Sequence, residues 1–180
     1  MASRQTRPTS LWPRSGRCGD RAAVVLLVQP ERDDREMYAE YLSHMGLTPI
    51  CVQDADAALR LACRADIIVT ELLLPGALDG YELIHRLKHS APTGNIPIVV
   101  LTVCAWTAEQ ARARSAGGDA FLSKPCLPHA LLRELCRRLR STHQSAAGTK
   151  RLDGWVTLST RHRVEDIGDT NERGIAADDA

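Results

Sequence analysis

The feature that most constrains the fold is a strict alternation of short apolar runs and helical stretches along residues 23–140. Three to six mostly aliphatic residues recur five times, each followed by a helical stretch, as expected for strands buried on both faces. The runs are Ala23–Val28, Thr48–Val52, Asp66–Thr70, Ile96–Leu101 and Ala120–Leu122. This alternation predicts a parallel sheet with right-handed crossovers and helices on both faces.

Capping residues mark the helix boundaries. Asp54 and Asp79 stand before helical stretches as N-caps, and Glu82 follows Asp79 at capping-box spacing. Thr107 and Gln110 repeat that spacing and predict the start of a fourth helix. The other boundary signals are Pro30 and Gly46 around a helix over 31–45, Gly117 and Gly118 after the fourth helix, and Pro128 at the start of the last.

Composition narrows the class of protein. The hydrophobic fraction of 44% and charged fraction of 25% are those of a globular chain. A net charge of +1 argues against a strongly basic nucleic-acid-binding protein, so no direct nucleic-acid contact is expected. No apolar run approaches the roughly 18–20 residues that cross a membrane, and the N-terminus lacks a signal peptide's apolar stretch. We therefore expect a cytoplasmic protein that makes no membrane contact and whose six cysteines are reduced.

The two ends of the chain differ from its middle. Residues 1–22 carry five arginines and one aspartate with no apolar period, which predicts a disordered basic arm. Residues 141–180 are polar, with five basic and seven acidic residues, and predict a mostly disordered tail. Within it, Trp155–Leu158 is compatible with an isolated strand or a docking peptide, but without a partner strand it would be marginal.

Sites in open parallel sheets lie at the carboxyl ends of the strands, near the switch in strand order. The residues that follow the predicted strands are therefore the candidates for a functional site. They are Gln29, Pro30, Thr70, Glu71, Thr102, Ser123 and Lys124.

Several of these residues stand in segments that resemble the receiver domain of two-component response regulators. The resemblance runs over Val24–Leu139, about two-thirds of the chain. It is carried by LLVQPERDDREMYAEYL, IIVTELLLPGALDGYELIHRLK, IPIVVLT and GGDAFLSKPCLP. It implies an α/β, flavodoxin-like, doubly wound sheet of five parallel strands in the order 2-1-3-4-5, with five helices.

The resemblance also implies what each site residue does. In that family an Asp after the third strand takes up a phosphoryl group, and two acids after the first strand hold Mg²⁺. A Ser or Thr after the fourth strand and a Lys after the fifth contact the phosphoryl oxygens. Here Glu71 stands at the phosphoacceptor position and Gln29 and Pro30 at the acidic pair, whereas Thr102 and Lys124 match the pattern. Phe121 takes the family's aromatic switch position.

Two of the three expected carboxylates are thus absent, and Mg²⁺ prefers carboxylate oxygens. We expect weak or no Mg²⁺ binding, no other cofactor and no phosphorylation. Glu31 or Asp33 could supply replacement ligands, which leaves open a phosphate-accepting receiver with a rescued metal site. Glu71 either mimics the charge of a phosphoryl group or only pairs with Lys124. A flavodoxin-like binder of a small ligand is a further alternative, although no glycine-rich phosphate loop is present.

The resemblance points to a signalling module and not to an enzyme. It implies protein–protein recognition in a two-component phosphorelay, with a histidine kinase or a downstream regulator as partner. Because the acidic site is degenerate, we expect this recognition to be independent of phosphorylation. The fourth helix, fifth strand and fifth helix would form the partner face. The same face could also hold two copies of the chain together as a homodimer. The residues of that face are Trp106, Gln110, Arg114, Phe121, Arg133 and Arg137. The family also implies a cis peptide bond between Lys124 and Pro125.

Overall fold

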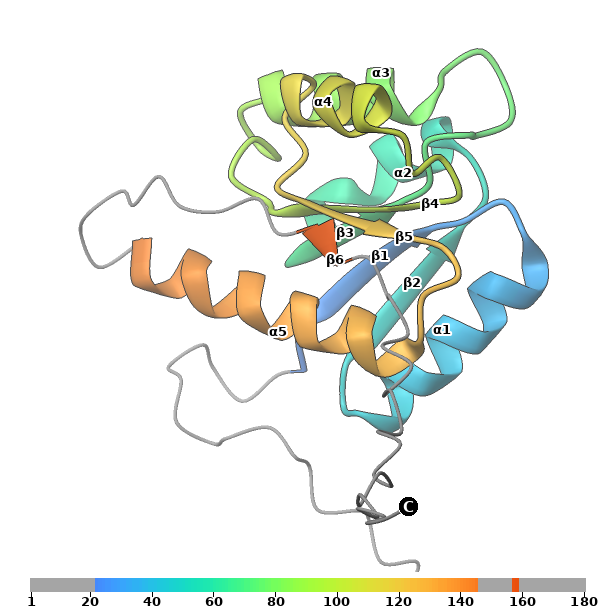
Figure 1. The fold of residues 1–180 in the computed structure, drawn as a ribbon. Coiled ribbons are helices and arrows are strands. Elements are labelled where there is room, and N and C mark those ends of the chain that lie inside the picture. Colours follow the sequence, from blue (N-terminus) through green and yellow to red (C-terminus); the bar gives the residue numbers. More distant parts are fainter. Residues whose placement is uncertain (1–21, 146–156, 159–180) are drawn as a thin grey trace, which may run out of the picture.

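A computed structural model describes residues 22–145 and 157–158 of the chain (Figure 1). The strands are β1 (Val24–Val28), β2 (Thr48–Val52), β3 (Ile67–Thr70), β4 (Ile98–Thr102), β5 (Ala120–Ser123) and β6 (Thr157–Leu158). The helices are α1 (Arg32–His44), α2 (Ala55–Leu61), α3 (Gly80–His89), α4 (Thr107–Ser115) and α5 (Pro128–Ser145), with a 3₁₀ turn η1 (Ala62–Arg64) after α2.

The described strands form one parallel sheet in the order β2-β1-β3-β4-β5-β6. The predicted order 2-1-3-4-5 with five helices is therefore confirmed. The addition is β6, a two-residue strand on the outer edge of β5. The switch in strand order lies between β1 and β3, so the carboxyl ends of these strands open onto one crevice.

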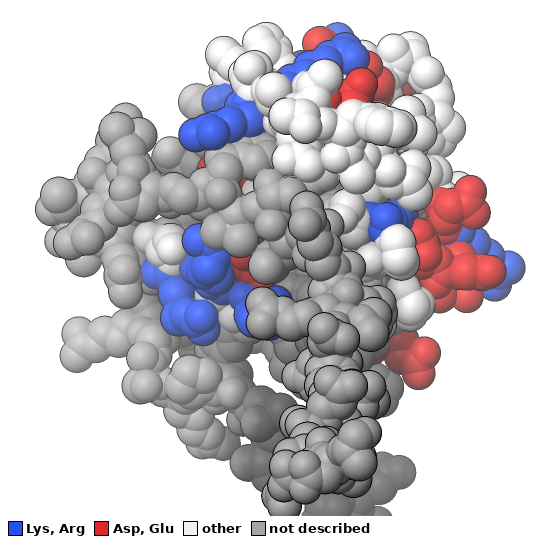
Figure 2. Space-filling model, in the orientation of Figure 1, with Lys and Arg blue, Asp and Glu red and all other residues white. Residues whose placement is uncertain are grey.

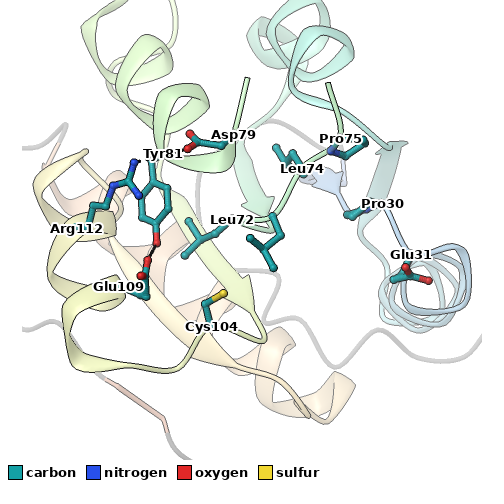
Figure 3. A pocket seen from close by; sticks show the side chains of 11 residues that line it. Pro30, Glu31, Leu72, Leu74, Pro75, Asp79, Tyr81, Cys104, Glu109 and Arg112 are labelled. Carbon is teal, nitrogen blue, oxygen red and sulfur yellow. Dashed lines mark hydrogen bonds and ion pairs between the residues drawn. The ribbon is translucent and has the colours of Figure 1, made fainter. Parts of the chain in front are cut away.

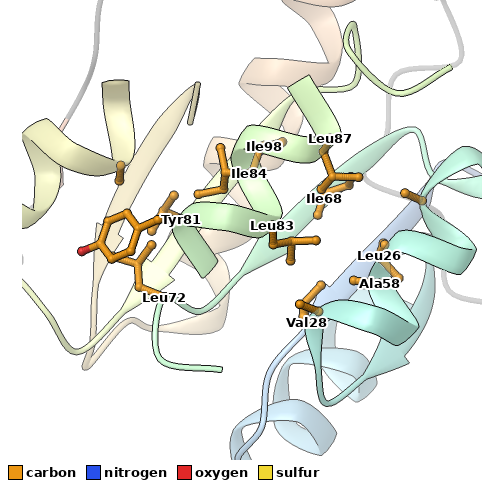
Figure 4. Packing of buried hydrophobic residues seen from close by; sticks show 14 of the residues in the cluster. Leu26, Val28, Ala58, Ile68, Leu72, Tyr81, Leu83, Ile84, Leu87 and Ile98 are labelled. Carbon is orange, nitrogen blue, oxygen red and sulfur yellow. The ribbon is translucent and has the colours of Figure 1, made fainter. Parts of the chain in front are cut away.

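The sheet divides the apolar core into two layers. Val25 and Leu27 face α1 and α5, whereas Leu26 and Val28 face α2 and α3 (Figure 4). Both sets are fully buried, which explains why β1 has no polar alternation. These two layers hold the strand ends that carry the candidate site in fixed positions.

The predicted caps of α2 and α3 are confirmed, but the capping box of α4 is wrong. Asp54 accepts a hydrogen bond from the Ala57 amide at 2.7 Å, and Asp79 from the Glu82 amide at 2.8 Å. Helix α4 starts one position earlier than its box requires: Trp106 is the N-cap, without a side-chain cap. The side-chain amide of Gln110 donates instead to the Ala105 carbonyl at 3.1 Å. Similarly, Pro30 precedes α1, whose N-cap is Glu31.

The ends of the folded region differ from the predicted boundaries. Helix α5 continues past residue 140 to Ser145, and Thr157–Leu158 find in β5 the partner strand that an isolated strand would lack. The predicted basic arm and the rest of the predicted tail lie outside the described residues. Among the helices described, none is both long and apolar enough to cross a membrane.

Candidate functional site

Lys124 lies at the centre of a polar cluster where β1, β3 and β5 end. Its ammonium nitrogen Nζ is 2.7 Å from Gln29 Oε1, 2.8 Å from Asp34 Oδ2 and 3.1 Å from Glu71 Oε2. An ammonium has three N–H donors, so the three oxygens account for its hydrogen-bonding capacity. The Lys124 side chain is only 10% exposed, and the chain itself therefore supplies the partners of this cation.

Glu71 follows β3 and has a partner for each carboxylate oxygen. Oε1 accepts a hydrogen bond from the Leu72 amide at 2.8 Å, and Oε2 pairs with Lys124. The side chain is 5% exposed, so its charge needs this pairing to be tolerated. Gly80 packs so closely on the Glu71 carbonyl that an added Cβ would lie 2.3 Å from the oxygen. The end of β3 is thereby fixed from the α3 side.

Gln29 and Pro30 occupy the positions of the expected acidic pair. Gln29 is fully buried, and its Nε2 donates to the Leu101 carbonyl at 3.3 Å while its Oε1 accepts from Lys124. Arg35 donates to the backbone carbonyls of Gln29 and Pro30 at 2.6 and 2.9 Å. A neutral amide and a proline thus stand where the family places two carboxylates, and Arg35 donates to the backbone of both residues.

Asp34 is the site residue that sequence reasoning missed. The replacement acids considered were Glu31 and Asp33, but Asp34 is the acid of α1 that pairs with Lys124. It lies in the first turn of α1 and is 36% exposed. Three acids follow Pro30 within four residues, so helical phase was the only signal that could separate them.

Thr102 and Phe121 are both inside the molecule. Thr102 ends β4, and its hydroxyl oxygen accepts a hydrogen bond from the Cys104 amide at 3.1 Å, which holds the loop after β4. Phe121 is fully buried in the core layer that includes Val100 and Ala113. The structure therefore places the Phe121 side chain in the core and not on the partner face.

The loop after β5 is fastened to α1. The Lys124–Pro125 peptide bond is cis, as the resemblance predicted. The Tyr38 hydroxyl, on α1, donates to the Cys126 carbonyl at 2.7 Å. Burial raises the pKa of Tyr38 far above its ordinary value, so this donor keeps its proton. Lys124 and Asp34 are therefore carried by two segments that are hydrogen-bonded to each other.

An open pocket of about 570 Å³ lies beside the cluster (Figure 3). Its lining is mainly apolar and includes Pro30, Leu72, Leu74 and Cys104. At its far side Tyr81 donates a hydrogen bond to Glu109, and the Arg112 guanidinium lies 3.9 Å from the centre of the Tyr81 ring (Figure 3). Within the described part of the chain, no group of three His, Cys, Asp or Glu residues is arranged to hold a metal ion.

The remaining partner-face residues lie on α4 and α5. Trp106, the N-cap of α4, is 76% exposed, and Arg114 is also exposed, whereas Gln110 is half-buried. On α5, Arg133 is exposed, while Arg137 makes two hydrogen bonds to the buried carboxylate of Glu134. Basic side chains gather over α5 and acidic ones over α1, whereas both charges occur near α3 and α4 (Figure 2).

Comparisons with known proteins agree with this geometry. The family model "Response regulator receiver domain" matches residues 25–136. The phosphate regulon transcriptional regulatory protein PhoB of Escherichia coli is 29% identical over 146 residues, which cover 79% of this chain and 63% of that protein. The two-component response regulator ORR6 of Oryza sativa is 32% identical over 121 residues, or 64% of this chain and 70% of that protein. The chain thus spans less than two-thirds of the length of PhoB.

Solved structures show the same fold. A putative response regulator from Chloroflexus aurantiacus superposes with a TM-score of 0.63 at 25% identity, covering 67% of this chain and 99% of that one. The receiver domain of the sensor histidine kinase PA1611 from Pseudomonas aeruginosa, solved with a magnesium ion in its active-site cleft, gives 0.61 at 27% identity, covering 66% and 98%. With most of its folded part matched by the family model, the chain belongs to the response regulator receiver domain family.

Proposed function

We propose that this chain is an atypical receiver module that works in two-component signalling by protein recognition and without accepting a phosphoryl group. The observation that carries the proposal is the cluster around Lys124, whose ammonium contacts three oxygens of its own chain. A lysine held in this way is not free to bind a phosphoryl group. The module is then a binding protein and not an enzyme, with a histidine kinase or a downstream regulator as its partner in the cytoplasm.

The residues present do not fit a magnesium site of the family's kind. Gln29 and Pro30 offer one neutral side-chain oxygen between them, and that oxygen already accepts from Lys124. A divalent ion bound by Glu71 and Asp34 would lie close to the ammonium that pairs with both. At roughly 4 Å and an effective dielectric constant of about 20, the repulsion between a dication and an ammonium is about 8 kcal/mol. Lys124 thus neutralises the Glu71 and Asp34 carboxylates in place of a divalent metal ion.

Glu71 is also poorly placed as a phosphoryl acceptor. Both Glu71 oxygens are held by the chain, Oε1 by the Leu72 amide and Oε2 by Lys124, so the carboxylate is fixed in an orientation set by these two partners. Without a divalent ion, repulsion between the carboxylate and the donor phosphate is not offset. These contacts support Glu71 as a fixed partner of Lys124.

The test is incubation of the full chain with acetyl phosphate and Mg²⁺, followed by intact-mass measurement. We expect no phosphoryl adduct on the native chain. A triple variant, Gln29→Asp, Pro30→Asp and Glu71→Asp, restores the three acids and serves as the matched control. A stoichiometric adduct on the native chain that is lost in Glu71→Ala would establish the alternative, a phosphate-accepting receiver in which Asp34 helps to hold the metal.

A further inference from the structure

The outer edge of β5 is occupied by a segment of the same chain. Thr157 and Leu158 form β6, which pairs in parallel with β5 in the register Phe121–Thr157 and Leu122–Leu158. Strand β5 lies between α4 and α5, so its edge is the middle of the face predicted to bind partners (Figure 1). An unpaired strand edge is a template for any extended peptide. Here β6 takes that place.

The connection from β5 to β6 is unlike the others in the sheet. Helices α2, α3 and α4 cover one face of the sheet. They connect β2 to β3, β3 to β4 and β4 to β5, so each connection moves the chain towards the β5 edge. Helix α5 covers the opposite face, yet β6 continues the sheet in the same direction. The β5–α5–β6 crossover therefore has the opposite hand to the earlier steps, whereas about 98% of parallel crossovers are right-handed. This topology indicates an added segment and not a sixth repeat of the fold.

Two more observations set β6 apart from the other strands. The pairing covers two residues only, far shorter than an ordinary strand of about 5–6 residues. The segment also lies beyond residue 136, where the match to the family model ends. Segments with so few backbone hydrogen bonds open at low free-energy cost.

We propose that Thr157–Leu158 is a displaceable cover on the β5 edge, which keeps the centre of the α4–β5–α5 face closed to other extended segments. Residues 146–156 tether the cover to α5, and a short tether holds a segment at an effective concentration in the millimolar range. A partner or a second copy that adds a strand to β5 must first displace it. This proposal depends on the proposed function only because that function assigns partners to the α4–β5–α5 face. It does not depend on whether Glu71 is phosphorylated.

The experiment measures access to the β5 edge directly. A synthetic peptide of residues 153–162 is titrated into the ¹⁵N-labelled full chain, and the amide resonances of Ala120–Ser123 are followed by NMR. The same titration is made on a variant with Thr157→Pro and Leu158→Pro. Adjacent residues of a strand direct their N–H groups to opposite sides, so the double substitution removes whichever donor faces β5. Gly168→Pro, outside β6, is the matched control.

The expected result follows from competition for one edge. If the cover is seated about nine times in ten, the native chain and Gly168→Pro bind the peptide about tenfold more weakly than the double proline variant. The Phe121 and Leu122 amide resonances should also shift in the double variant before any peptide is added. Equal peptide affinities in all three chains would overturn the proposal. So would a peptide that leaves the β5 resonances of every chain unchanged.

Discussion

Replacing Lys124 by Met tests whether this ammonium neutralises the site. Met has similar length and keeps the apolar stem, but it cannot pair with a carboxylate. The substitution leaves Glu71, 5% exposed, without a cation, and the fully buried Gln29 Oε1 without its donor. Asp34 is exposed enough to be hydrated instead.

The size of the effect follows from burial. Removing one partner of a buried ion pair costs about 3–5 kcal/mol because a charge is left uncompensated. That is a large part of the roughly 5–15 kcal/mol by which a domain is stable. Adding Glu71→Gln removes the orphaned charge, so the double variant should recover about 2 kcal/mol of the loss.

The free energy of unfolding is measured by urea denaturation followed by circular dichroism at neutral pH. Arg32→Met is the control, because the Arg32–Glu36 pair is 77% and 61% exposed and water screens it, so its loss should leave the free energy of unfolding nearly unchanged. A Lys124→Met variant within about 1 kcal/mol of the native chain would refute the reasoning, as the cost of an unpaired buried charge is several times larger. A double variant no more stable than Lys124→Met alone would refute it as well, because the orphaned Glu71 charge would then not be the source of the loss.

Two further predictions concern α5 and α4. Burial favours the neutral form of Glu134, but the hydrogen bonds and charges of Arg137 and Arg138 outweigh it and hold the pKa of this carboxyl below its ordinary value. The Glu134 carboxylate therefore stabilises the fold at pH values above its ordinary pKa, and this stabilisation is lost as the pH falls through the lowered pKa. In Glu134→Gln, the free energy of unfolding, measured by urea denaturation at a series of acidic pH values, should fall less steeply with decreasing pH than in the native chain. Helix α4 has Ala113 as its one fully buried residue and is fastened by the Tyr81–Glu109 hydrogen bond. Tyr81→Phe should therefore speed amide hydrogen exchange in α4 and cost about 1 kcal/mol by urea denaturation, whereas unchanged exchange would show that the bond does not hold the helix.

The convergence of the site was predictable because it depends on topology. Parallel strands end on one edge of the sheet, so residues that follow β1, β3 and β5 had to meet, and Gln29, Glu71 and Lys124 do. The apolar runs likewise indicated which strands are buried on both faces. Strand order followed from the resemblance to receiver domains, and not from the hydrophobic pattern alone.

The features that the sequence did not reveal depend on three-dimensional geometry: the rotation of a helix about its axis, the length of a side chain and the pairing of distant segments. Asp34 pairs with Lys124 because of the phase of α1 and the length of a lysine side chain, and of these only the phase is a signal that the sequence carries. The burial of Phe121 was foreseeable because it lies within the apolar run Ala120–Leu122, but its family position suggested a surface role. The sequence indicated a candidate strand at Trp155–Leu158, but nothing in it identified β5 as the partner strand.

If Lys124 stands in for a divalent cation, the Gln29 side-chain amide reports on this role most directly. Its Nε2 donates to the Leu101 carbonyl while its Oε1 accepts from Lys124, so any ion that displaces the ammonium must change this resonance. Mg²⁺ is titrated into the ¹⁵N-labelled chain, with the Glu71→Gln variant in parallel. We predict that the Gln29 resonance does not move over the millimolar range. A saturable shift in the native chain that is absent in Glu71→Gln would contradict the account.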